Sequence, residues 1–291
     1  MSIFKKIREL NSIPKRTVKY PFPDWEPWDI FPLGAGVGYN QVNLNVSITS
    51  HTLLTGLSQS GKSVALRSIV MHALQSPEWR VVIVDLKRLG FLPYCNHPYV
   101  LDIATELDAA LSLIEQIEQE IQFRYIAMQE EGVNFFKNLE NPPPAILLII
   151  DELYDVLAPE KIRNNKSKER DDWRTMIGLL IDSIARIGRA AGIHMILATK
   201  HPDIVLLSPE TKANIDSRIV IGPLDLGSSK LILNTDDATR ILDIQGHGLF
   251  AYGSKLTEFQ AYFLPEEQLD LVLEMASALA TKAIGLDAFL D

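Results

Sequence analysis

The chain has 291 residues, which is enough for a sizeable core in one large domain or two small ones. A net charge of −9 argues against a protein whose whole surface binds nucleic acid, although a local basic groove or pore loop remains compatible with it. The single cysteine, Cys95, excludes an intramolecular disulfide and suggests a reducing compartment. The most hydrophobic run, Ala145–Ile150, is far shorter than a membrane span requires.

Residues 1–49 differ in composition from the rest of the chain and are expected to form a basic tail and an arm. Residues 1–19 are rich in lysine and arginine and open without the long apolar run of a signal peptide. They suit a solvated tail, with a membrane-surface anchor as the alternative. Residues 20–34 combine prolines with aromatic side chains, which predicts an extended arm strapped across a domain surface or bound to a partner.

From residue 50 to 291 we expect one α/β domain in which apolar strands alternate with helices. The strands are nearly continuous apolar runs, which is typical of strands covered on both faces of a mainly parallel sheet. A helix is predicted over 105–129, capped by Thr105, with one apolar stripe. The predicted strands are 81–85, 146–151, 194–199 and 217–222.

The polar segment Pro159–Arg174 is rich in charged residues and lacks apolar periodicity before Trp173, so it is expected to be a solvated loop. After residue 222, the runs GLFAY (248–252) and FQAYF (259–263) predict a hairpin. A closing helix is predicted over Glu266–Leu279.

The stretch GLSQSGKS (56–63), which we call the phosphate loop, fits the pattern G-x-x-x-x-G-K-[ST]. It lies between a predicted strand and a predicted helix. Glycines allow backbone N–H groups to surround a phosphate chain, and the following helix offers its positive N-terminus. Lys62 is expected to reach the β- and γ-phosphates, while Ser63 binds Mg²⁺. The predicted nucleotide-binding residues are Gly56, Leu57, Ser58, Gln59, Ser60, Gly61, Lys62, Ser63 and Val64.

The acidic pair Asp151 and Glu152 ends the buried strand 146–151. Asp151 is placed to hold Mg²⁺, and Glu152 to polarise the water that attacks the γ-phosphate. Helix capping is the alternative role for two acids at a strand end. The run NNKSKE is not the guanine-reading motif Asn-Lys-x-Asp of a GTPase, so ATP is the expected nucleotide.

The order of these motifs resembles the FtsK/SpoIIIE branch of the FtsK–HerA motor ATPases over about residues 50–255. HTLLTGLSQSGKSV is similar to the family's phosphate loop, and VVIVDLKRLGFLPY to its second strand, with Leu86 where the family has proline. The resemblance also rests on four later segments: RYIAMQEEGV (124–133), RAAGIHMILATKHPD (189–203), TKANIDSR (211–218) and ILDIQGHGLFAYG (241–253).

The resemblance implies a RecA-like ATPase that uses ATP and Mg²⁺ and assembles as a homo-oligomer, expected to be a hexameric ring. The implied cargo is double-stranded DNA, moved for a conjugative plasmid, an integrative element or a phage. The alternative is a type VII secretion-like ATPase that acts on protein. Membrane, relaxosome or secretion proteins would be its partners, and the chain would be cytoplasmic, with recruitment to the inner membrane face as a further expectation.

In such rings an arginine of the neighbouring subunit contacts the γ-phosphate. Arg218 is the preferred candidate, with Arg189 and Arg186 as alternatives; each could instead form a structural ion pair, or act as a sensor within its own subunit. Lys200 stands at the family's polar sensor position, where the usual residue is glutamine. A lysine donates to phosphate but accepts no hydrogen bond, so sensing would differ, unless this is only a variable surface turn.

Overall fold

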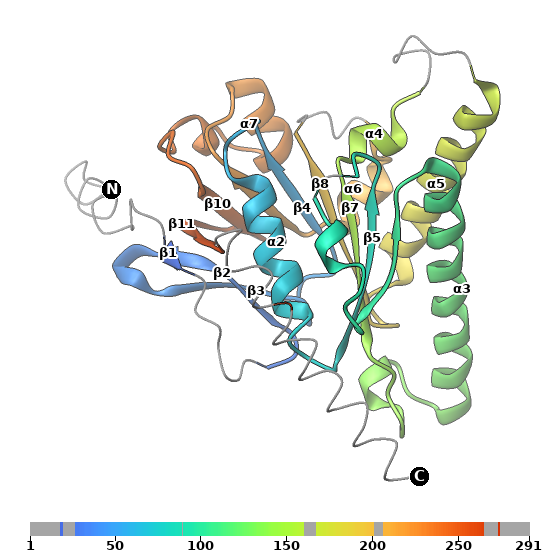
Figure 1. Cartoon of the computed structure of the whole chain (residues 1–291). Helices are drawn as coiled ribbons and strands as arrows, with labels where there is room; N and C mark the ends of the chain where they lie inside the picture. The colour runs from blue at the N-terminus through green and yellow to red at the C-terminus, as the bar shows by residue number, and fades with distance from the viewer. Residues whose placement is uncertain are drawn as a thin grey trace.

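The strands of the computed structural model form one sheet with helices on both faces (Figure 1). The structure describes residues 18–19, 27–88, 90–159, 167–200, 206–264 and 273. Within this part of the chain the sheet has eleven strands, in the order β3-β2-β11-β10-β9-β4-β8-β7-β5-β6, with β1 paired to β11. Their bounds are β1 Val18–Lys19, β2 Ile30–Gly36, β3 Gln41–Asn45, β4 Thr52–Gly56, β5 Trp79–Asp85, β6 Val100–Ala104, β7 Ala145–Asp151, β8 Ile193–Thr199, β9 Ser217–Ile221, β10 His247–Tyr252 and β11 Lys255–Phe263.

The run of strands β9-β4-β8-β7-β5-β6 is parallel throughout. The four apolar runs predicted from the sequence are β5, β7, β8 and β9, and the predicted mainly parallel α/β fold is confirmed. Side chains alternate along β5, so that Val81 and Ile83 join the core beneath α2 (Lys62–Ala73). Val82 and Val84 face α3 (Leu107–Glu131) and α5 (Lys168–Ile187) on the other side of the sheet. Burial on both faces explains why these strands are apolar without alternation.

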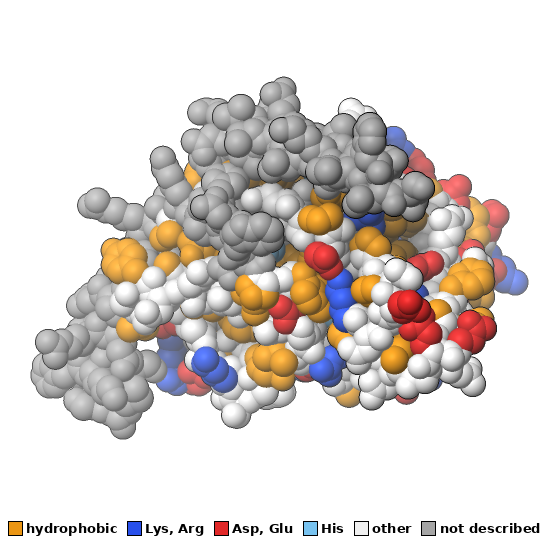
Figure 2. All heavy atoms as spheres, turned by 90° about the horizontal axis from the view of Figure 1, so that it is seen from below, with side chains coloured by type: hydrophobic (Ala, Val, Ile, Leu, Met, Phe, Trp, Pro, Cys, Tyr) orange, Lys and Arg blue, Asp and Glu red, His pale blue; other side chains and the backbone are white. Residues whose placement is uncertain are grey.

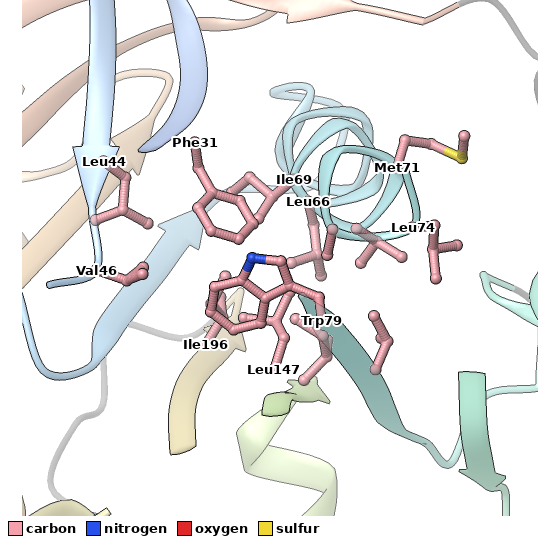
Figure 3. Packing of buried hydrophobic residues seen from close by; sticks show 14 of the residues in the cluster. Phe31, Leu44, Val46, Leu66, Ile69, Met71, Leu74, Trp79, Leu147 and Ile196 are labelled. Atoms are coloured by element: carbon pink, nitrogen blue, oxygen red, sulfur yellow. The ribbon is translucent and has the colours of Figure 1, made fainter. Parts of the chain in front are cut away.

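The core beneath α2 is organised around Trp79, whose side chain is 1% exposed (Figure 3). Phe31 of β2 packs edge-on against it at 5.1 Å between ring centroids, and the indole Nε1 donates to the backbone oxygen of Trp28 at 2.7 Å. Residues 30–34 therefore differ from the expected strap, because they belong to a strand inside the sheet and bury their aromatic side chain. The division of the chain at residue 50 stays a prediction, since the sheet is continuous across it.

An antiparallel extension completes the sheet beyond β9. The predicted hairpin is confirmed as β10 and β11, and β11 pairs with β2. The shorter helices are α4 Leu153–Leu157, α6 Pro209–Asn214 and α7 Leu226–Leu233, with 3₁₀ turns at Val37–Tyr39, Leu92–Tyr94, Phe136–Asn138 and Asp237–Thr239.

Two local predictions are wrong. Helix α3 begins at Leu107 with Glu106 in the cap position, so Thr105 lies outside the helix and does not cap it. The segment expected to be a loop over Pro159–Arg174 becomes helical at Lys168, where the hydroxyl of Ser167 accepts the N–H of Arg170 at 3.4 Å. This cap and a buried stripe that includes Arg174 stabilise the first turns despite their charge.

The predicted tail over 1–19 lies outside the described residues except for Val18 and Lys19, and the predicted closing helix does so except for Leu273. Among the helices that the structure describes, none is long and apolar enough to cross a membrane.

Candidate functional site

Four adjacent strands, β4, β8, β7 and β5, end at the same edge of the sheet, which we call the carboxyl edge. The phosphate loop follows β4, Lys200 follows β8, and Asp151 and Glu152 end β7. Lys87 follows β5. Residues far apart in sequence meet here because parallel strands all deliver their carboxyl ends to one edge, where ligands of α/β proteins bind.

The phosphate loop has the backbone that its glycines predict. Gly61 adopts φ +100°, and a Cβ there would lie 2.8 Å from the backbone nitrogen of Gly246. The N–H of Gly246 donates to the carbonyl of Ser60 at 2.7 Å, which holds the loop against the segment before β10. A side chain at position 61 would therefore be strained and would separate these two segments.

The loop fits a bound phosphate chain by a second criterion. Among the residues described, no side chain caps the N-terminus of α2, whose first residue is Lys62. Leu57, Ser58 and Gln59 are exposed. Unsatisfied N–H groups at a helix N-terminus, together with the helix dipole, attract an anion. Lys62 and an open loop beside it are therefore suited to the phosphates of a nucleotide.

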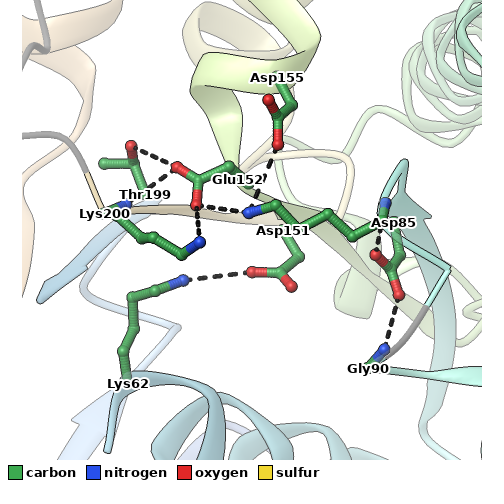
Figure 4. Close-up of polar contacts among 9 residues, drawn as sticks. Lys62, Asp85, Gly90, Asp151, Glu152, Asp155, Thr199 and Lys200 are labelled. Carbon is green, nitrogen blue, oxygen red and sulfur yellow. Dashed lines mark hydrogen bonds and ion pairs between the residues drawn. The ribbon is translucent and has the colours of Figure 1, made fainter. Parts of the chain in front are cut away.

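Lys62 and Asp151 form an ion pair across the centre of the site (Figure 4). The Lys62 Nζ lies 3.2 Å from the Asp151 Oδ1, and the two side chains are 5% and 13% exposed. The structure thus brings together the lysine predicted to bind phosphate and the carboxylate predicted to hold a cation. Ser63 lies on the first turn of α2 and is exposed. A hydroxyl and a carboxylate are oxygen ligands of the kind that Mg²⁺ prefers, so the donor set fits the predicted ion.

Glu152 lies deeper than Asp151, with its side chain 3% exposed and its backbone at φ +68°. Its Oε1 accepts the Thr199 hydroxyl at 3.2 Å and the Lys200 backbone N–H at 3.0 Å. Its Oε2 accepts the Lys87 Nζ at 2.7 Å and lies 3.6 Å from the Lys200 Nζ. Burial alone would raise the pKa of this carboxyl, but the hydrogen bonds from Lys87 and the Lys200 N–H lower it below its usual value.

Lys87 connects the end of β5 with the end of β7 and with α4. Its Nζ lies 3.4 Å from the Asp155 Oδ2 on α4, in addition to its bond to Glu152. Its backbone N–H donates to Asp85 Oδ1 at 3.1 Å, and Gly90 N–H donates to Asp85 Oδ2 at 3.0 Å. The buried Asp85 carboxylate, shown with Gly90 in Figure 4, therefore fixes the turn. This turn carries Lys87.

The structure places Lys200, the sensor candidate, between the phosphate loop and Asp151, because β8 lies between β4 and β7. Its side chain is 42% exposed and faces Glu152. Its sequence neighbour His201 lies outside the described residues.

The candidate arginines lie away from this edge. Arg218 is half-buried on β9, where the parallel register sets it beside Leu53, three residues before Gly56. At the usual rise per residue this separates its Cα from Gly56 by roughly 10 Å along the strand. Burial lowers the pKa of its guanidinium. Arg218 is thus not brought together with the phosphate loop of its own chain.

Near the opposite edge, Arg186 is exposed in the last turn of α5, and Arg189 is exposed in the loop between α5 and β8. The Arg189 Nη2 donates to the carbonyl of Ser47 at 2.7 Å. The loop after α5 therefore uses one of the two arginines for a structural contact.

Sequence reasoning missed Lys87, Thr199 and Asp85 as parts of the site. One sequence signal could have identified all three: each is a polar or charged residue at or just after the carboxyl end of a predicted parallel strand. The bond between Lys87 and Glu152 joins residues 65 positions apart, which motif spacing does not reveal.

Residues 28–141 match the profile of the FtsK/SpoIIIE family. The DNA translocase FtsK of Corynebacterium glutamicum is 27% identical over 272 residues, covering 84% of this chain and 28% of the relative. FtsK of Halalkalibacterium halodurans is 29% identical over 271 residues, covering 84% and 32%. The chain thus spans about a third of the length of these relatives.

Among solved structures, the pCW3 conjugation coupling protein TcpA, a monomer form with ATPγS, matches with a TM-score of 0.83 and 24% identity. The match covers 92% of this chain and 75% of TcpA. ATPases 2 and 3 of EssC from Geobacillus thermodenitrificans match with a TM-score of 0.76 and 18% identity, covering 93% and 52%. At these identities the likeness concerns the fold, which is that of P-loop ATPases.

Proposed function

We propose that this chain, which carries an FtsK/SpoIIIE family domain, is an ATP-driven motor that moves double-stranded DNA. The family and the ATPase structures that the fold resembles indicate an ATPase. The proposal of DNA as the cargo rests on the similarity to FtsK translocases. The assembly that we propose is a homo-oligomeric ring with the nucleotide between subunits.

The observation that carries the ATPase assignment is the Lys62–Asp151 pair beside the open phosphate loop. Lys62 would leave Asp151 for the β- and γ-phosphates of ATP, and Asp151 and Ser63 would be the residues that hold Mg²⁺. Bound Mg²⁺ supplies charge neutralisation at the phosphates. Glu152 then orients and deprotonates the attacking water.

The surface charge agrees with a motor whose DNA contacts are confined to loops. Basic, acidic and apolar side chains are interspersed on the face seen from below in Figure 2, without a continuous basic stripe among the described residues drawn there. With a net charge of −9, binding to DNA would depend on local pore-facing segments in a ring.

ATPase rates of the purified chain test the proposal. We expect double-stranded DNA to increase the rate several-fold, and the variant Lys62→Ala to lose turnover and bind ATP more weakly, because the cation facing the phosphates is gone. The matched control is Lys230→Ala on the exposed surface of α7, which should behave as wild type.

Near wild-type hydrolysis by Lys62→Ala would show that the phosphate-loop assignment is wrong. Stimulation by a protein substrate but not by DNA would favour the secretion-type ATPase instead. Light scattering with ATP and DNA present checks the ring, since a protein that stays monomeric under these conditions cannot use a trans arginine.

A further inference from the structure

We propose that Lys87 is a positioning residue that restrains the Glu152 carboxylate and sets the basal rate of ATP hydrolysis. In the structure Lys87 holds Glu152, and hydrolysis requires Lys87 to move toward Asp155. This inference rests on the proposed ATPase function and adds a restraint on its general base.

Glu152 already accepts three hydrogen bonds, and a second ammonium group lies near its Oε2. An ionised carboxylate has about four lone-pair sites on its two oxygens. Oε1 accepts two donors, from Thr199 and from the Lys200 backbone, and Oε2 faces the ammonium groups of Lys87 and Lys200. A water that is to be deprotonated must reach one of the two oxygens, and at Oε2 it competes with the Lys87 ammonium, which is hydrogen-bonded there at 2.7 Å.

The two donors to Oε1 cannot easily leave, because both belong to the end of β8. The Thr199 hydroxyl comes from the last residue of this buried strand, and the Lys200 N–H belongs to the following backbone. The two ammonium groups near Oε2 belong to flexible side chains. Of these, the Lys87 Nζ is the tighter contact, at 2.7 Å against 3.6 Å for the Lys200 Nζ. Lys87 is therefore the main restraint on the oxygen that can be freed.

Lys87 has a second carboxylate within reach, and this lowers the free-energy cost of breaking its contact with Glu152. Its Nζ is 3.4 Å from the Asp155 Oδ2, and Asp155 is more exposed than Glu152, at 22% against 3%. The Lys87 backbone stays fixed by Asp85, so only the side chain has to swing. An ammonium group that moves from one carboxylate to the other keeps a charge-assisted hydrogen bond at both ends of the movement.

The experiment compares steady-state ATP hydrolysis, without DNA, by wild type, Lys87→Met and Arg88→Met. Methionine keeps the length of the lysine stem and removes its donor. We expect Lys87→Met to hydrolyse ATP about tenfold faster than wild type, because a larger fraction of Glu152 is then free to take the water. Arg88→Met is the matched control: Arg88 lies on the same turn and pairs with Glu106, away from Glu152.

A second variant, Asp155→Asn, removes the charge that draws Lys87 away and should lower the basal rate about twofold or more, with unchanged ATP binding. Opposite effects at positions 87 and 155 distinguish a restraint from a structural role, which would lower both rates. Thermal unfolding of each variant confirms that it is folded.

If wild type binds and hydrolyses ATP but Lys87→Met is no faster, the restraint is wrong and the ATPase assignment stands. If Lys87→Met loses turnover while remaining folded, Lys87 supports the base and does not restrain it. If no variant binds ATP, the proposed function and this inference both fail.

Discussion

The two edges of the parallel sheet handle buried polar groups in opposite ways. At the carboxyl edge two buried ions have ion-pair partners: Lys62 pairs with Asp151, and Glu152 pairs with Lys87. At the opposite edge, which we call the amino edge, the buried titratable groups among the described residues include two histidines. His51 precedes β4 and is 1% exposed, and His194 is the second residue of β8 and is 2% exposed.

This difference separates groups that exchange partners from groups that keep them. Each ion at the carboxyl edge has a partner that a nucleotide, a cation or a neighbouring carboxylate can replace. His51 Nδ1 accepts the Met195 N–H at 3.1 Å, and His194 Nδ1 donates to the Ser50 carbonyl at 3.2 Å. These backbone bonds join the starts of two strands and have no replacement, so the amino edge is structural within one subunit.

The largest predicted effect concerns Arg218, which lies outside the carboxyl edge. A catalytic task for this arginine would contradict the assignment of all exchangeable ions to that edge. Arg218 lies too far along β9 to be grouped with its own phosphate loop. Arg218→Ala subunits should bind ATP yet lose roughly 10³-fold or more in turnover when assembled alone. Mixed with Lys62→Ala subunits, they should regain some activity, since a boundary with one intact phosphate loop and one intact Arg218 forms by chance.

Mixing experiments with Arg186→Ala and Arg189→Ala provide the controls. Complementation by either of these, with none by Arg218→Ala, would assign the trans role to that arginine. An absence of complementation by all three, in assembled protein, would leave the arginines with structural roles and place the whole catalytic set at the carboxyl edge.

A smaller effect is expected within the carboxyl edge itself. Glu152→Gln keeps the size of the side chain and leaves Asp151 in place, so nucleotide binding should persist. Loss of the general base should slow hydrolysis by roughly 10²-fold or more, and the ATP-bound oligomer should accumulate. Binding of ATP and its turnover are measured separately on the same sample. Equal loss of both would show that Glu152 supports the fold or the metal.

The sequence was sufficient for the parts of the molecule governed by local rules. The phosphate loop, the buried strands and the hairpin follow from glycine placement, apolar runs and turn positions, and each was predicted. The strand β2 was not, because its proline and aromatic residues suit an exposed arm as well as a sheet; only the packing of Phe31 on Trp79 decides between them. The start of α5 was missed because capping by Ser167 outweighs its polar composition.

The candidate site divides in the same way. Lys62, Asp151 and Glu152 follow from motifs, since each motif lies on one continuous strand end. The contacts of Lys87 do not, because they depend on the order β8-β7-β5, which sequence order alone does not reveal. The placement of Arg218 beside Leu53 depends likewise on the pairing of β4 with β9.

The smallest predicted effect sharpens the comparison through the pH dependence of stability. Burial lowers the pKa of His51 from 6.5 to about 3, with a further contribution from His194. Burial also lowers the pKa of His194 from 6.5 to about 4. Between these values and 6.5 the unfolded chain binds protons that the folded chain does not. Above pH 6.5 these two histidines should therefore leave the free energy of unfolding unchanged. As the pH drops from 6.5 toward 4, they should lower it.

Each of these two histidines should contribute a loss of about 2 kcal/mol at pH 5 relative to pH 7.5. The measurement is urea unfolding at both pH values, for wild type and for His51→Asn, whose amide oxygen can accept the Met195 N–H as His51 Nδ1 does. The variant should lose less stability than wild type on acidification, by an amount of that order. An unchanged pH dependence would mean that His51 is not held neutral by the fold. The amino edge would then resemble the carboxyl edge, with a buried group that can carry charge.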